Sequence, residues 1–457
     1  MKRPAESRKH RPRGDRPPPE RVPDLLRRVL GEALALNAPA DAVLRRFFRE
    51  HRSLGRRDRA DIADTVFDVL RNKRLYAHFA EAGEGPLEDR LARLSRVWRD
   101  RAASSQGVVP AGAVNLPAQP DWLARLPAAN LDALPVPVAL SLPDWLYQKL
   151  CERFGEAEAR ALGRALLEPA SLHLRANLLK TRRDALIERL TQEGLHVRPL
   201  SIAPCALEVD GHPALERSAA FEDGAFEVQD AGSQLLALLV GARRGQNVVD
   251  LCAGAGGKTL ALAASMHSSG QIFACDVSIA RLQRLRPRLT RSGATNVQPF
   301  AIDSLTDRKL ERLVGRAHAV LVDAPCTGSG TLRRNPDLKW RFGPEDLSRL
   351  CHEQRSILAA AARLVAPDGV LVYATCSLLA EENEAQAKWF EERQPEFQRE
   401  DAQPIMAAAG ATLPDDAFVD GALVCVPHRH GTDAFFGIRW RRVRLTNQSG
   451  AAAEASG

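Results

Sequence analysis

The stretch NVVDLCAGAGGKTLALAASM, residues 247–266, decides the fold class of this chain. Its first residues are apolar and β-branched, as in a buried strand, and its last residues form an apolar helical run. Between them lies a loop with three glycines, where the backbone can approach a ligand closely. The amides at the start of the following helix favour a polar or anionic group. The order strand, glycine-rich loop, helix therefore predicts a nucleotide-like cofactor site in an α/β domain.

Two kinds of cofactor site fit this loop, and the first is a P-loop. The P-loop pattern GxxxxGK[ST] places a glycine five positions before the glycine of GKT. Residue 252 occupies that position and is a cysteine, so the GKT at residues 257–259 is an incomplete phosphate-binding motif. The run VLVD, which ends at Asp323, still resembles the Walker B strand of a P-loop NTPase. A P-loop NTPase is therefore one alternative.

The second kind of site binds S-adenosylmethionine. In that interpretation Asp250 and the glycine-rich loop hold the amino acid part of the cofactor. Asp276 ends the next predicted strand, 19 residues past Gly257, which is about the spacing at which an acid binds ribose hydroxyls in doubly wound folds. Asp303 follows a third strand and is placed to meet the adenine amine. The alternative is that these aspartates only cap the helices that follow them.

Further apolar runs continue the α/β pattern after this stretch. Five runs are expected to form strands that alternate with helices: 247–251, 271–275, 298–301, 319–323 and 369–375. Two later runs, 422–426 and 435–440, are expected to form an antiparallel closing pair. The fold class predicted for this part of the chain is α/β with a Rossmann-like sheet.

Two cysteines follow predicted strands. Cys326 lies in VLVDAPCTGSG and Cys376 lies in GVLVYATCSL. The carboxyl ends of parallel strands meet at one edge of a sheet, where ligands bind, so both thiols are expected at that edge together with Asp323. The alternative is a pair of small core residues, since free cysteines are often buried.

Two thiols and a carboxylate beside a methyl donor suit methylation at C5 of a pyrimidine. C5 becomes nucleophilic after a thiolate adds to C6, and the adduct can then take the methyl group. Asp323 is expected to hold the N3/N4 edge of cytosine, whereas methylation of an amino group would need no thiol. A basic run with one tryptophan follows the first thiol and is expected to bind RNA near the site: Arg333, Arg334, Lys339, Trp340 and Arg341.

The composition excludes several classes of protein. Of the 457 residues, 45% are hydrophobic and 26% are charged, as in a globular protein of two or three domains at about 150 residues each. No apolar run approaches the roughly 18–20 residues of a membrane span, and the basic N-terminus lacks the apolar region of a secretory signal. The eight cysteines include no CxxC pair, so we predict reduced thiols and no metal site. We expect a cytoplasmic monomer without a membrane partner.

Positive charge gathers in the first 75 residues. They hold 20 Lys and Arg against 11 Asp and Glu, a net of +9, which leaves −2 for the rest of a chain whose total is +7. Such a basic segment fits a polyanion such as nucleic acid, and the alternative is an ordinary solvated surface. Its arginines include Arg45, Arg46, Arg49, Arg52, Arg56, Arg57 and Arg59.

Apolar periodicity and composition divide the chain into five predicted segments. They are a disordered basic tail (1–21), a helical domain (22–135), a small α+β module (143–230), the Rossmann-like domain (231–444) and a disordered tail (445–457). The sequence LPVPVALSLP, residues 134–143, is expected to be a linker. In the α+β module, Arg175, Asn177 and Lys180 are expected on one exposed face.

Four motifs make the catalytic part recognisable: DLCAGAGGKT, CDVS, VDAPCTGSGTLRRNPDLKWR and YATCSLLAEENEAQ. Together they resemble the Nop/Sun family of RNA cytosine-5 methyltransferases, most closely its bacterial RsmB type, which acts on small-subunit rRNA. The resemblance covers most of residues 171–440. Residues 45–74, RRFFREHRSLGRRDRADIADTVFDVLRNKR, resemble the NusB-like helical RNA-binding domain that precedes the catalytic part in that type.

The resemblance implies a role for each site residue. Cys376 would be the nucleophile, and Cys326 would assist release of the methylated product. The S-adenosylmethionine site would be lined by Cys252, Ala253, Gly254, Ala255, Gly256, Gly257, Lys258, Asp276, Asp303 and Asp323. The family usually has Ala-Pro where this chain has Gly254–Ala255, a change that frees the loop but removes no side-chain contact. Besides the P-loop NTPase, the remaining alternative is a non-catalytic RNA-binding protein that keeps the cofactor fold.

Overall fold

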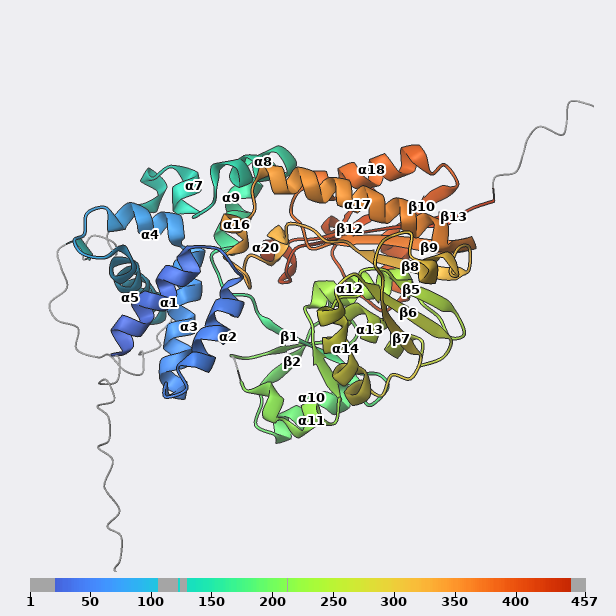
Figure 1. Cartoon of the computed structure of the whole chain (residues 1–457), viewed down its shortest axis with the longest axis horizontal. Helices are drawn as coiled ribbons and strands as arrows, with labels where there is room; N and C mark the ends of the chain where they lie inside the picture. Colours follow the sequence, from blue (N-terminus) through green and yellow to red (C-terminus); the bar gives the residue numbers. More distant parts are fainter. Residues whose placement is uncertain (1–20, 106–121, 124–129, 212, 445–457) are drawn as a thin grey trace, which may run out of the picture. The chain divides into compact units, whose positions relative to one another are not determined.

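The computed structural model describes residues 21–105, 122–123, 130–211 and 213–444 (Figure 1). The two predicted disordered tails lie outside these residues, apart from Arg21. The chain forms two compact units. The first comprises Met1–Leu70 with Phe79–Ala129, and the second comprises Arg71–His78 with Asn130–Gly457.

The first unit is helical, as predicted. Its helices, with α4 shared between the units, are α1 Val22–Leu34, α2 Ala40–Glu50, α3 Arg56–Arg71, α4 Lys73–Ala80 and α5 Leu87–Ser105. A proline in the first turn starts α1, because its fixed φ suits that position and the helix needs no amide there. The three- and four-residue spacing places Val29, Leu30, Val43 and Phe47 on buried faces.

Residues 71–78 belong to the second unit, although they lie inside the segment predicted as one helical domain. Arg74 donates to the Asp144 carboxylate at 2.7 Å and to the Leu142 carbonyl at 2.7 Å. Lys339 donates to the Arg71 carbonyl at 2.6 Å. A truncation that removes the predicted basic tail and helical domain, residues 1–135, would therefore also remove part of the second unit.

The segment 134–143, predicted as a linker, is packed into the second unit. A 3-10 turn η1 (Leu131–Ala133) precedes it, and a helical turn α7 (Val136–Ala139), which prolines start, lies within it. Leu140 and Leu142 are buried in a cluster with Leu146 and Leu150. The turn residues of this segment therefore shape a buried corner of the fold.

The α+β module is confirmed as a four-stranded antiparallel sheet in the order β2-β3-β1-β4. Its elements are α8 Asp144–Phe154, α9 Glu156–Ala165, β1 Leu172–Ala176, α10 Arg183–Gln192, β2 Val197–Pro199, β3 Ala206–Val209, η2 Leu215–Arg217, α11 Ala219–Glu222 and β4 Phe226–Val228. The short edge strand β2 was not predicted, because it carries a proline and exposed residues.

The prediction that Arg175, Asn177 and Lys180 share one exposed face of this module is wrong for two of the three residues. Arg175 and Asn177 are only 5% and 2% exposed, whereas Lys180 is exposed. The reason is that β1 is a central strand, paired with β3 on one side and β4 on the other. Arg175 donates to Gln229 at 2.7 Å, and Asn177 donates to the carbonyls of Gly224 and Ser292.

The catalytic sheet follows the predicted alternation of strands and helices. Its parallel strands are β5 Asn247–Asp250, β6 Gln271–Asp276, β7 Val297–Ala301, β8 Ala317–Asp323 and β9 Val365–Thr375. The predicted closing pair, β12 Ala422–Cys425 and β13 Phe435–Arg442, is antiparallel, and β13 also pairs antiparallel with β9. Polar β10 (Phe397–Glu400) and two-residue β11 (Phe418–Val419) were not predicted, because neither has an apolar run.

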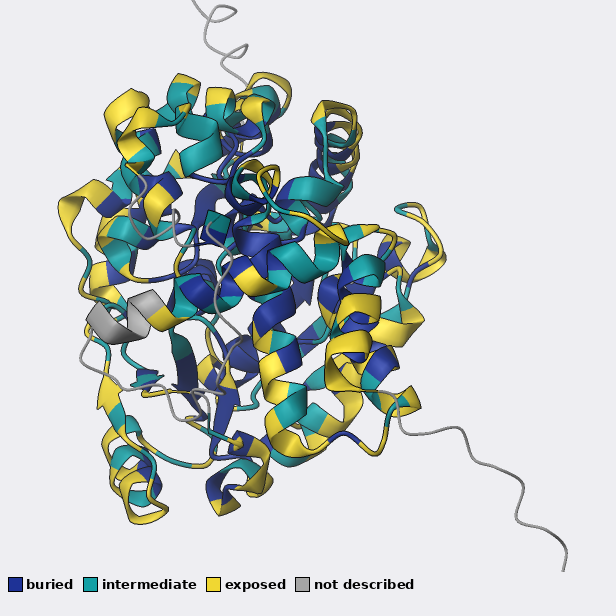
Figure 2. Cartoon of the chain, turned by 90° about the vertical axis from the view of Figure 1, so that its left-hand side faces the viewer, coloured by how far each residue is buried: buried dark blue, intermediate teal, exposed yellow. Residues whose placement is uncertain are grey.

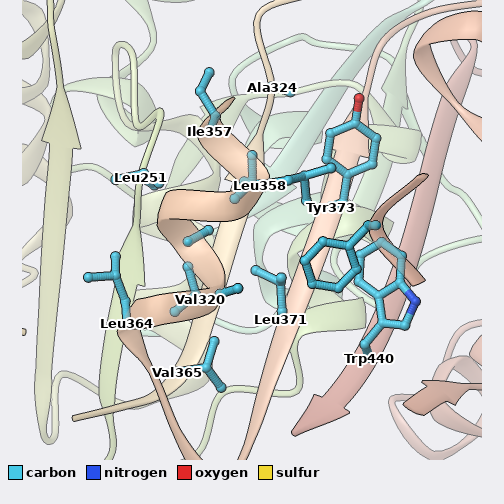
Figure 3. Close-up of a cluster of buried hydrophobic side chains, with 14 of the residues drawn as sticks. Leu251, Val320, Ala324, Ile357, Leu358, Leu364, Val365, Leu371, Tyr373 and Trp440 are labelled. Atoms are coloured by element: carbon cyan, nitrogen blue, oxygen red, sulfur yellow. The ribbon is translucent and has the colours of Figure 1, made fainter. Parts of the chain in front are cut away.

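Helices cover both faces of this sheet. The helices of this part of the chain are α12 Ala231–Val240, α13 Gly257–Ser265, α14 Ile279–Ser292, α15 Arg308–Glu311, α16 Leu338–Arg341, α17 Pro344–Leu364, α18 Glu384–Arg393, α19 Ala402–Ala408 and α20 Pro427–His430, with 3-10 turns η3 Ser329–Thr331, η4 Ala380–Glu382 and η5 Asp415–Ala417. Residues of α12, α13 and α19 share one buried cluster with the strands. Residues of α17 and α18 share another, where Leu358 and Trp440 lie beside Leu371 (Figure 3). Dark blue, buried residues concentrate on the strands and inner helix turns in Figure 2.

The whole strand order is β11-β12-β13-β9-β8-β5-β6-β7, and its parallel strands, β9-β8-β5-β6-β7, have one position where the chain changes direction across the sheet. It lies between β5 and β8. In open α/β sheets the ligand crevice opens at such a switch point, outside the carboxyl ends of the strands. The loops after β5 and β8 carry the glycines and the first thiol, so the topology places both at that crevice.

Candidate active site

The loop between β5 and α13 is shaped by two glycines with positive φ. Gly254 has a φ of 56° and Gly256 a φ of 83°, values that residues with a Cβ rarely adopt. A Cβ on Gly256 would lie 2.1 Å from Leu285, so this position admits only glycine. A Cβ on Gly254 would meet nothing within 4 Å. The backbone at Gly254 thus faces open space that a ligand can approach.

Asp276, at the end of β6, holds this loop in place through hydrogen bonds. The side chain is 4% exposed and accepts hydrogen bonds from the amides of Gly254 at 2.8 Å and Ser278 at 2.7 Å. The predicted acid therefore lies beside the glycine-rich loop. Asp303, in contrast, is exposed after β7, and its backbone amide donates to Asp307 at 3.0 Å.

Asp250, the last residue of β5, is a buried acid beneath the loop. One carboxylate oxygen accepts from the Thr259 hydroxyl at 2.6 Å, and the other has no hydrogen-bond partner among the described residues. Burial raises the pKa of Asp250 to about 7, although the Thr259 hydrogen bond opposes this shift. A buried acceptor without a partner beside an open glycine backbone suits the cationic amino acid group of S-adenosylmethionine.

Lys258 and Asp323 form an ion pair between the glycine-rich loop and the end of β8. Their charged atoms are 2.8 Å apart, and Lys258 is 9% exposed. Burial lowers the pKa of Lys258, but the charges and hydrogen bond around it, chiefly those of Asp323, together outweigh burial, so the net shift is upward. The lysine is therefore held as a cation at the centre of the crevice.

The two thiols meet at the ends of adjacent strands. The Cys326 and Cys376 sulfur atoms are 3.4 Å apart. The amide of Ala324 donates to the Ala374 carbonyl, and that of Gly330 donates to the Cys376 carbonyl, each at 2.9 Å. These bonds hold the two loops side by side. The pKa of Cys326 is raised well above its usual value, first by its hydrogen bond to Cys376 and then by burial.

A buried acid that the sequence analysis did not single out lies behind both thiols. Glu382, in the YATCSLLAEENEAQ motif, is fully buried and accepts hydrogen bonds from both thiol loops. A charged residue six positions after Cys376, next to an apolar LLA run, was the available signal. Charged residues are fully buried only when they are paired or hydrogen-bonded.

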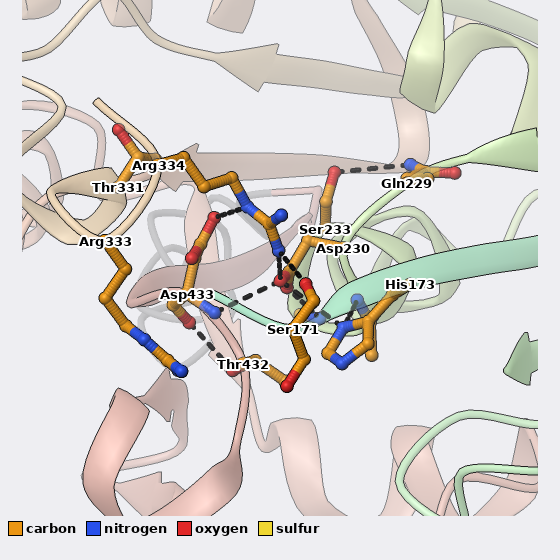
Figure 4. A network of polar contacts seen from close by, with 12 residues as sticks. Ser171, His173, Gln229, Asp230, Ser233, Thr331, Arg333, Arg334, Thr432 and Asp433 are labelled. Carbon is orange, nitrogen blue, oxygen red and sulfur yellow. Dashed lines mark hydrogen bonds and ion pairs between the residues drawn. The ribbon is translucent and has the colours of Figure 1, made fainter. Parts of the chain in front are cut away.

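The basic run after the first thiol does not form the free RNA-binding surface that we predicted. Arg334 donates to Asp433 at 2.6 Å and to Asp230 at 2.7 Å (Figure 4). Lys339 is 3% exposed, and burial lowers its pKa. Side chains of this run thus stabilise the second unit, because Arg334 pairs with buried carboxylates and Lys339 donates a hydrogen bond to the Arg71 carbonyl.

The remaining cysteines fit the prediction of free thiols. Among the described residues none is paired in a disulfide. Burial raises the pKa of Cys252 well above its usual value and likewise raises that of Cys275. In the described part of the chain no group of His, Cys, Asp and Glu has the arrangement of a metal site, and no helix is long and apolar enough to cross a membrane.

Sequence comparison identifies the family of this site. The family described as 16S rRNA methyltransferase RsmB/F matches residues 237–440, and the ferredoxin-like domain of RsmF/B-like methyltransferases matches residues 142–216. A probable ribosomal RNA small subunit methyltransferase B from Synechocystis is 35% identical over 65% of this chain and 66% of its own length. A protein of the same name from Bacillus subtilis is 31% identical over 67% of this chain and 69% of its own length.

The chain belongs to the RsmB/F family of methyltransferases. The resemblance drawn from the four motifs is therefore confirmed, and so is the Rossmann-like methyltransferase fold. The matched regions span about two thirds of the length of these two relatives.

Solved structures agree with this assignment to the RsmB/F family. The crystal structure of PH0851 is similar over 92% of this chain and 98% of its own, with a TM-score of 0.72 and 25% identity. A methyltransferase homolog protein from Pyrococcus horikoshii is similar over 67% of this chain and 98% of its own, with a TM-score of 0.58 and 28% identity. S-Adenosylmethionine is the cofactor that the family and the loop geometry indicate together.

Proposed function

We propose that this protein transfers a methyl group from S-adenosylmethionine to C5 of a cytosine in small-subunit rRNA, through a covalent adduct with Cys376. The observation that carries this proposal is the pair of thiols, 3.4 Å apart, in the crevice that also holds the Lys258–Asp323 ion pair. Methyl transfer to a ring nitrogen or an amino group would use neither thiol, since those atoms are already nucleophilic.

The first step is addition of Cys376 to the pyrimidine. The Cys376 S–H proton passes to solvent water, the thiolate sulfur forms a bond to C6, and the electron pair of the C5–C6 double bond moves toward C5, N3 and the C2 carbonyl. Asp323 holds the N3/N4 edge of the base, and Lys258 offsets the negative charge that develops at the site. The cofactor supplies the methyl group as an electrophile on its sulfonium.

The second step releases the product. The C5 proton passes to a base, the C5–C6 double bond forms again, and the electron pair of the C6–S bond returns to the Cys376 sulfur. Cys326 assists by donating its S–H to that departing sulfur. Its sulfur lies within 3.4 Å, and its raised pKa keeps the proton available.

The relatives support rRNA as the substrate. Both are named as ribosomal RNA small subunit methyltransferases. The first unit offers a fitting basic surface, because Arg49, Arg52, Arg56 and Arg57 are exposed and form no ion pair among the described residues. The two alternatives are less well supported. A P-loop lysine must reach phosphates, whereas Lys258 is paired with Asp323, and a non-catalytic protein has no need of two thiols in contact.

The test is transfer of a labelled methyl group to rRNA by the purified full-length protein. Free small-subunit rRNA from cells lacking the protein should accept the label, and bisulfite sequencing should locate one new 5-methylcytosine. Label in an amino group, or hydrolysis of ATP without methyl transfer, would contradict the proposal. Large-subunit rRNA serves as the control and should remain unlabelled.

A further inference from the structure

Glu382 lies at the centre of a buried hydrogen-bond network that joins the two thiol loops. Its carboxylate accepts four hydrogen bonds, and three of them come from residues that directly follow a thiol. The amide and hydroxyl of Thr327, next to Cys326, donate at 2.9 and 2.6 Å. The hydroxyl of Ser377, next to Cys376, donates at 2.5 Å. One carboxylate therefore accepts hydrogen bonds, in each loop, from the residue that directly follows the thiol.

The fourth donor fixes the carboxylate from the side of α17. Gln354 donates to Glu382 at 3.1 Å and to the Pro325 carbonyl at 2.9 Å, so it contacts the first loop just before Cys326. The Glu382 carbonyl also accepts from the Tyr373 hydroxyl at 2.7 Å. Both partners are fully buried, Gln354 on α17 and Tyr373 on the interior strand β9, so they anchor Glu382 to the core.

A second set of contacts closes the network between the loops. The Ser329 hydroxyl lies 3.2 Å from the Ser377 hydroxyl and accepts from the Leu378 amide at 2.8 Å. Asn383 donates to the Ser377 carbonyl at 2.9 Å. Since Ser329 is on the first loop and Ser377 on the second, the loops are tied together directly as well as through Glu382.

No cation neutralises this carboxylate among the described residues, where Glu382 takes part in no ion pair. Burial raises its pKa, and the hydrogen bonds from Ser377, Thr327 and Gln354 lower it. A buried acid without a countercharge is costly, since hydrogen bonds must replace its hydration. An apolar residue would leave these four donors without an acceptor, and glutamine offers one accepting oxygen instead of two, so the carboxylate is the group that satisfies both loops.

We propose that Glu382 is a positioning residue that holds the two thiol loops in register, so that Cys326 stays within hydrogen-bonding distance of Cys376. It touches neither the cofactor loop nor the thiols, and it acts through Thr327 and Ser377. Its negative charge also contributes to the raised pKa of Cys326, after the hydrogen bond to Cys376 and burial. This role rests on the proposed function, because Cys326 has to lie close to Cys376 when the Cys376 sulfur leaves C6 and accepts a hydrogen bond.

The test uses the full-length protein and the variants Glu382→Gln, Glu382→Asp and, as a matched control, Glu384→Gln. Glu384 lies two residues away, and its carboxylate pairs with Arg153 at the surface. The first readout needs neither RNA nor cofactor. The alkylation of Cys326 and Cys376 by iodoacetamide is followed from pH 6 to pH 10 by peptide mass spectrometry, because only the thiolate reacts.

In Glu382→Gln, alkylation of Cys326 should begin at lower pH than in the wild type, because a charge that raises its pKa is gone. Glu382→Asp, which keeps the charge, should restore the wild-type profile, and Glu384→Gln should not alter it. In the methylation assay, kcat of Glu382→Gln should fall on the order of 10–100-fold, with little change in KM for RNA, as expected for misplaced reacting groups.

The proposal is overturned if the Cys326 profile of Glu382→Gln matches the wild type, or if KM rises while kcat holds. If Glu382→Gln does not fold, Ser377→Ala carries the test in the methylation assay, because it removes one of the four hydrogen bonds but keeps the charge: kcat should fall with little change in KM for RNA, and an unchanged kcat would overturn the proposal. The alkylation readout stands even if the wild type methylates no RNA, so failure of the proposed function and failure of this inference are distinguishable.

Discussion

The two sides of the active crevice are built in opposite ways. On the thiol side, the loops after β8 and β9 are joined by a buried network in which Glu382 accepts four hydrogen bonds. On the cofactor side, the loop after β5 leaves polar groups available. Asp250 keeps an oxygen without a partner among the described residues, and the backbone at Gly254 faces open space.

The difference separates two tasks. The nucleophile has to be held in one geometry, because a misplaced reacting atom reduces the rate by orders of magnitude. The cofactor loop has to exchange partners, since each turnover brings a new cofactor and releases the used one. We therefore expect substitutions on the thiol side to change the rate of chemistry, and those on the cofactor side to change affinity.

The largest expected effect is on the thiol side. Cys376→Ala should lower methyl transfer at least about a thousandfold and remove the covalent RNA adduct, because the attacking group is gone. Cys326→Ala should also stop turnover but let the adduct accumulate, since attack proceeds and release stalls. Denaturing gel electrophoresis of protein with labelled RNA measures the adduct.

Cys151→Ala is the matched control, because this free cysteine lies on α8, outside the thiol loops. It should retain wild-type adduct levels and turnover. An adduct that persists in Cys376→Ala and disappears in Cys326→Ala would reverse the two roles, as in DNA cytosine-C5 methyltransferases, where the cysteine of the PC motif attacks.

The next effect is on cofactor affinity. Asp276→Ala should weaken S-adenosylmethionine binding by about 1–3 kcal/mol, because the Gly254 and Ser278 amides lose their acceptor in a buried place. Asp303→Ala should cost less, since Asp303 is exposed and remains solvated without the ligand. Isothermal titration calorimetry without RNA compares the two. Equal losses of cofactor affinity in the two variants would mean that the difference in burial between Asp276 and Asp303 does not determine how much each contributes to binding.

A third prediction concerns the pH dependence of cofactor binding. With a pKa of about 7, Asp250 is mostly protonated at pH 6 and mostly ionised at pH 8. If its free oxygen binds the cofactor ammonium, only the ionised form binds well. The affinity of the wild type should therefore rise about tenfold from pH 6 to pH 8. In Asp250→Asn the affinity should be lower at pH 8 and nearly independent of pH. A wild-type affinity that falls as pH rises would exclude this interaction.

The smallest effects are expected in the first unit. Replacing Arg49, Arg52, Arg56 and Arg57 by alanine should weaken rRNA binding and make its salt dependence less steep, by a slope of about 0.7–0.9 for each phosphate that the protein no longer neutralises. The matched control replaces Arg45 and Arg46, which already pair with Asp41 and Glu32. Filter binding at several salt concentrations measures both slopes, and identical slopes would remove this surface from the RNA interface.

The sequence was sufficient for the parts of the fold that local patterns determine. Apolar runs predicted the five parallel strands and the antiparallel closing pair, and the glycines predicted the cofactor loop. The edge strands β2 and β10 were missed, because proline and polar residues hide a strand whose pairing comes from its neighbours.

Tertiary pairing also explains the errors in the site. Arg334 and Lys339 look like RNA-binding residues in the sequence, but partners distant in the chain occupy them. Glu382 became recognisable as a site residue only when the fold placed it beside Thr327, 55 residues earlier. Residue type and spacing predict which atoms reach an edge of a sheet, whereas they do not reveal which of those atoms are already bound.

The position of β13 has a consequence for synthesis of the protein. This strand follows all other strands of the sheet in chain order, yet it lies between β9 and β12. At roughly 5–20 residues per second, β9 and the second thiol emerge several seconds before their antiparallel partner is made. During that interval one side of β9 is an open edge that can pair with another chain. Completion of the sheet beside β9 thus waits for β13, and slow synthesis of the residues between these two strands would prolong the risk of aggregation.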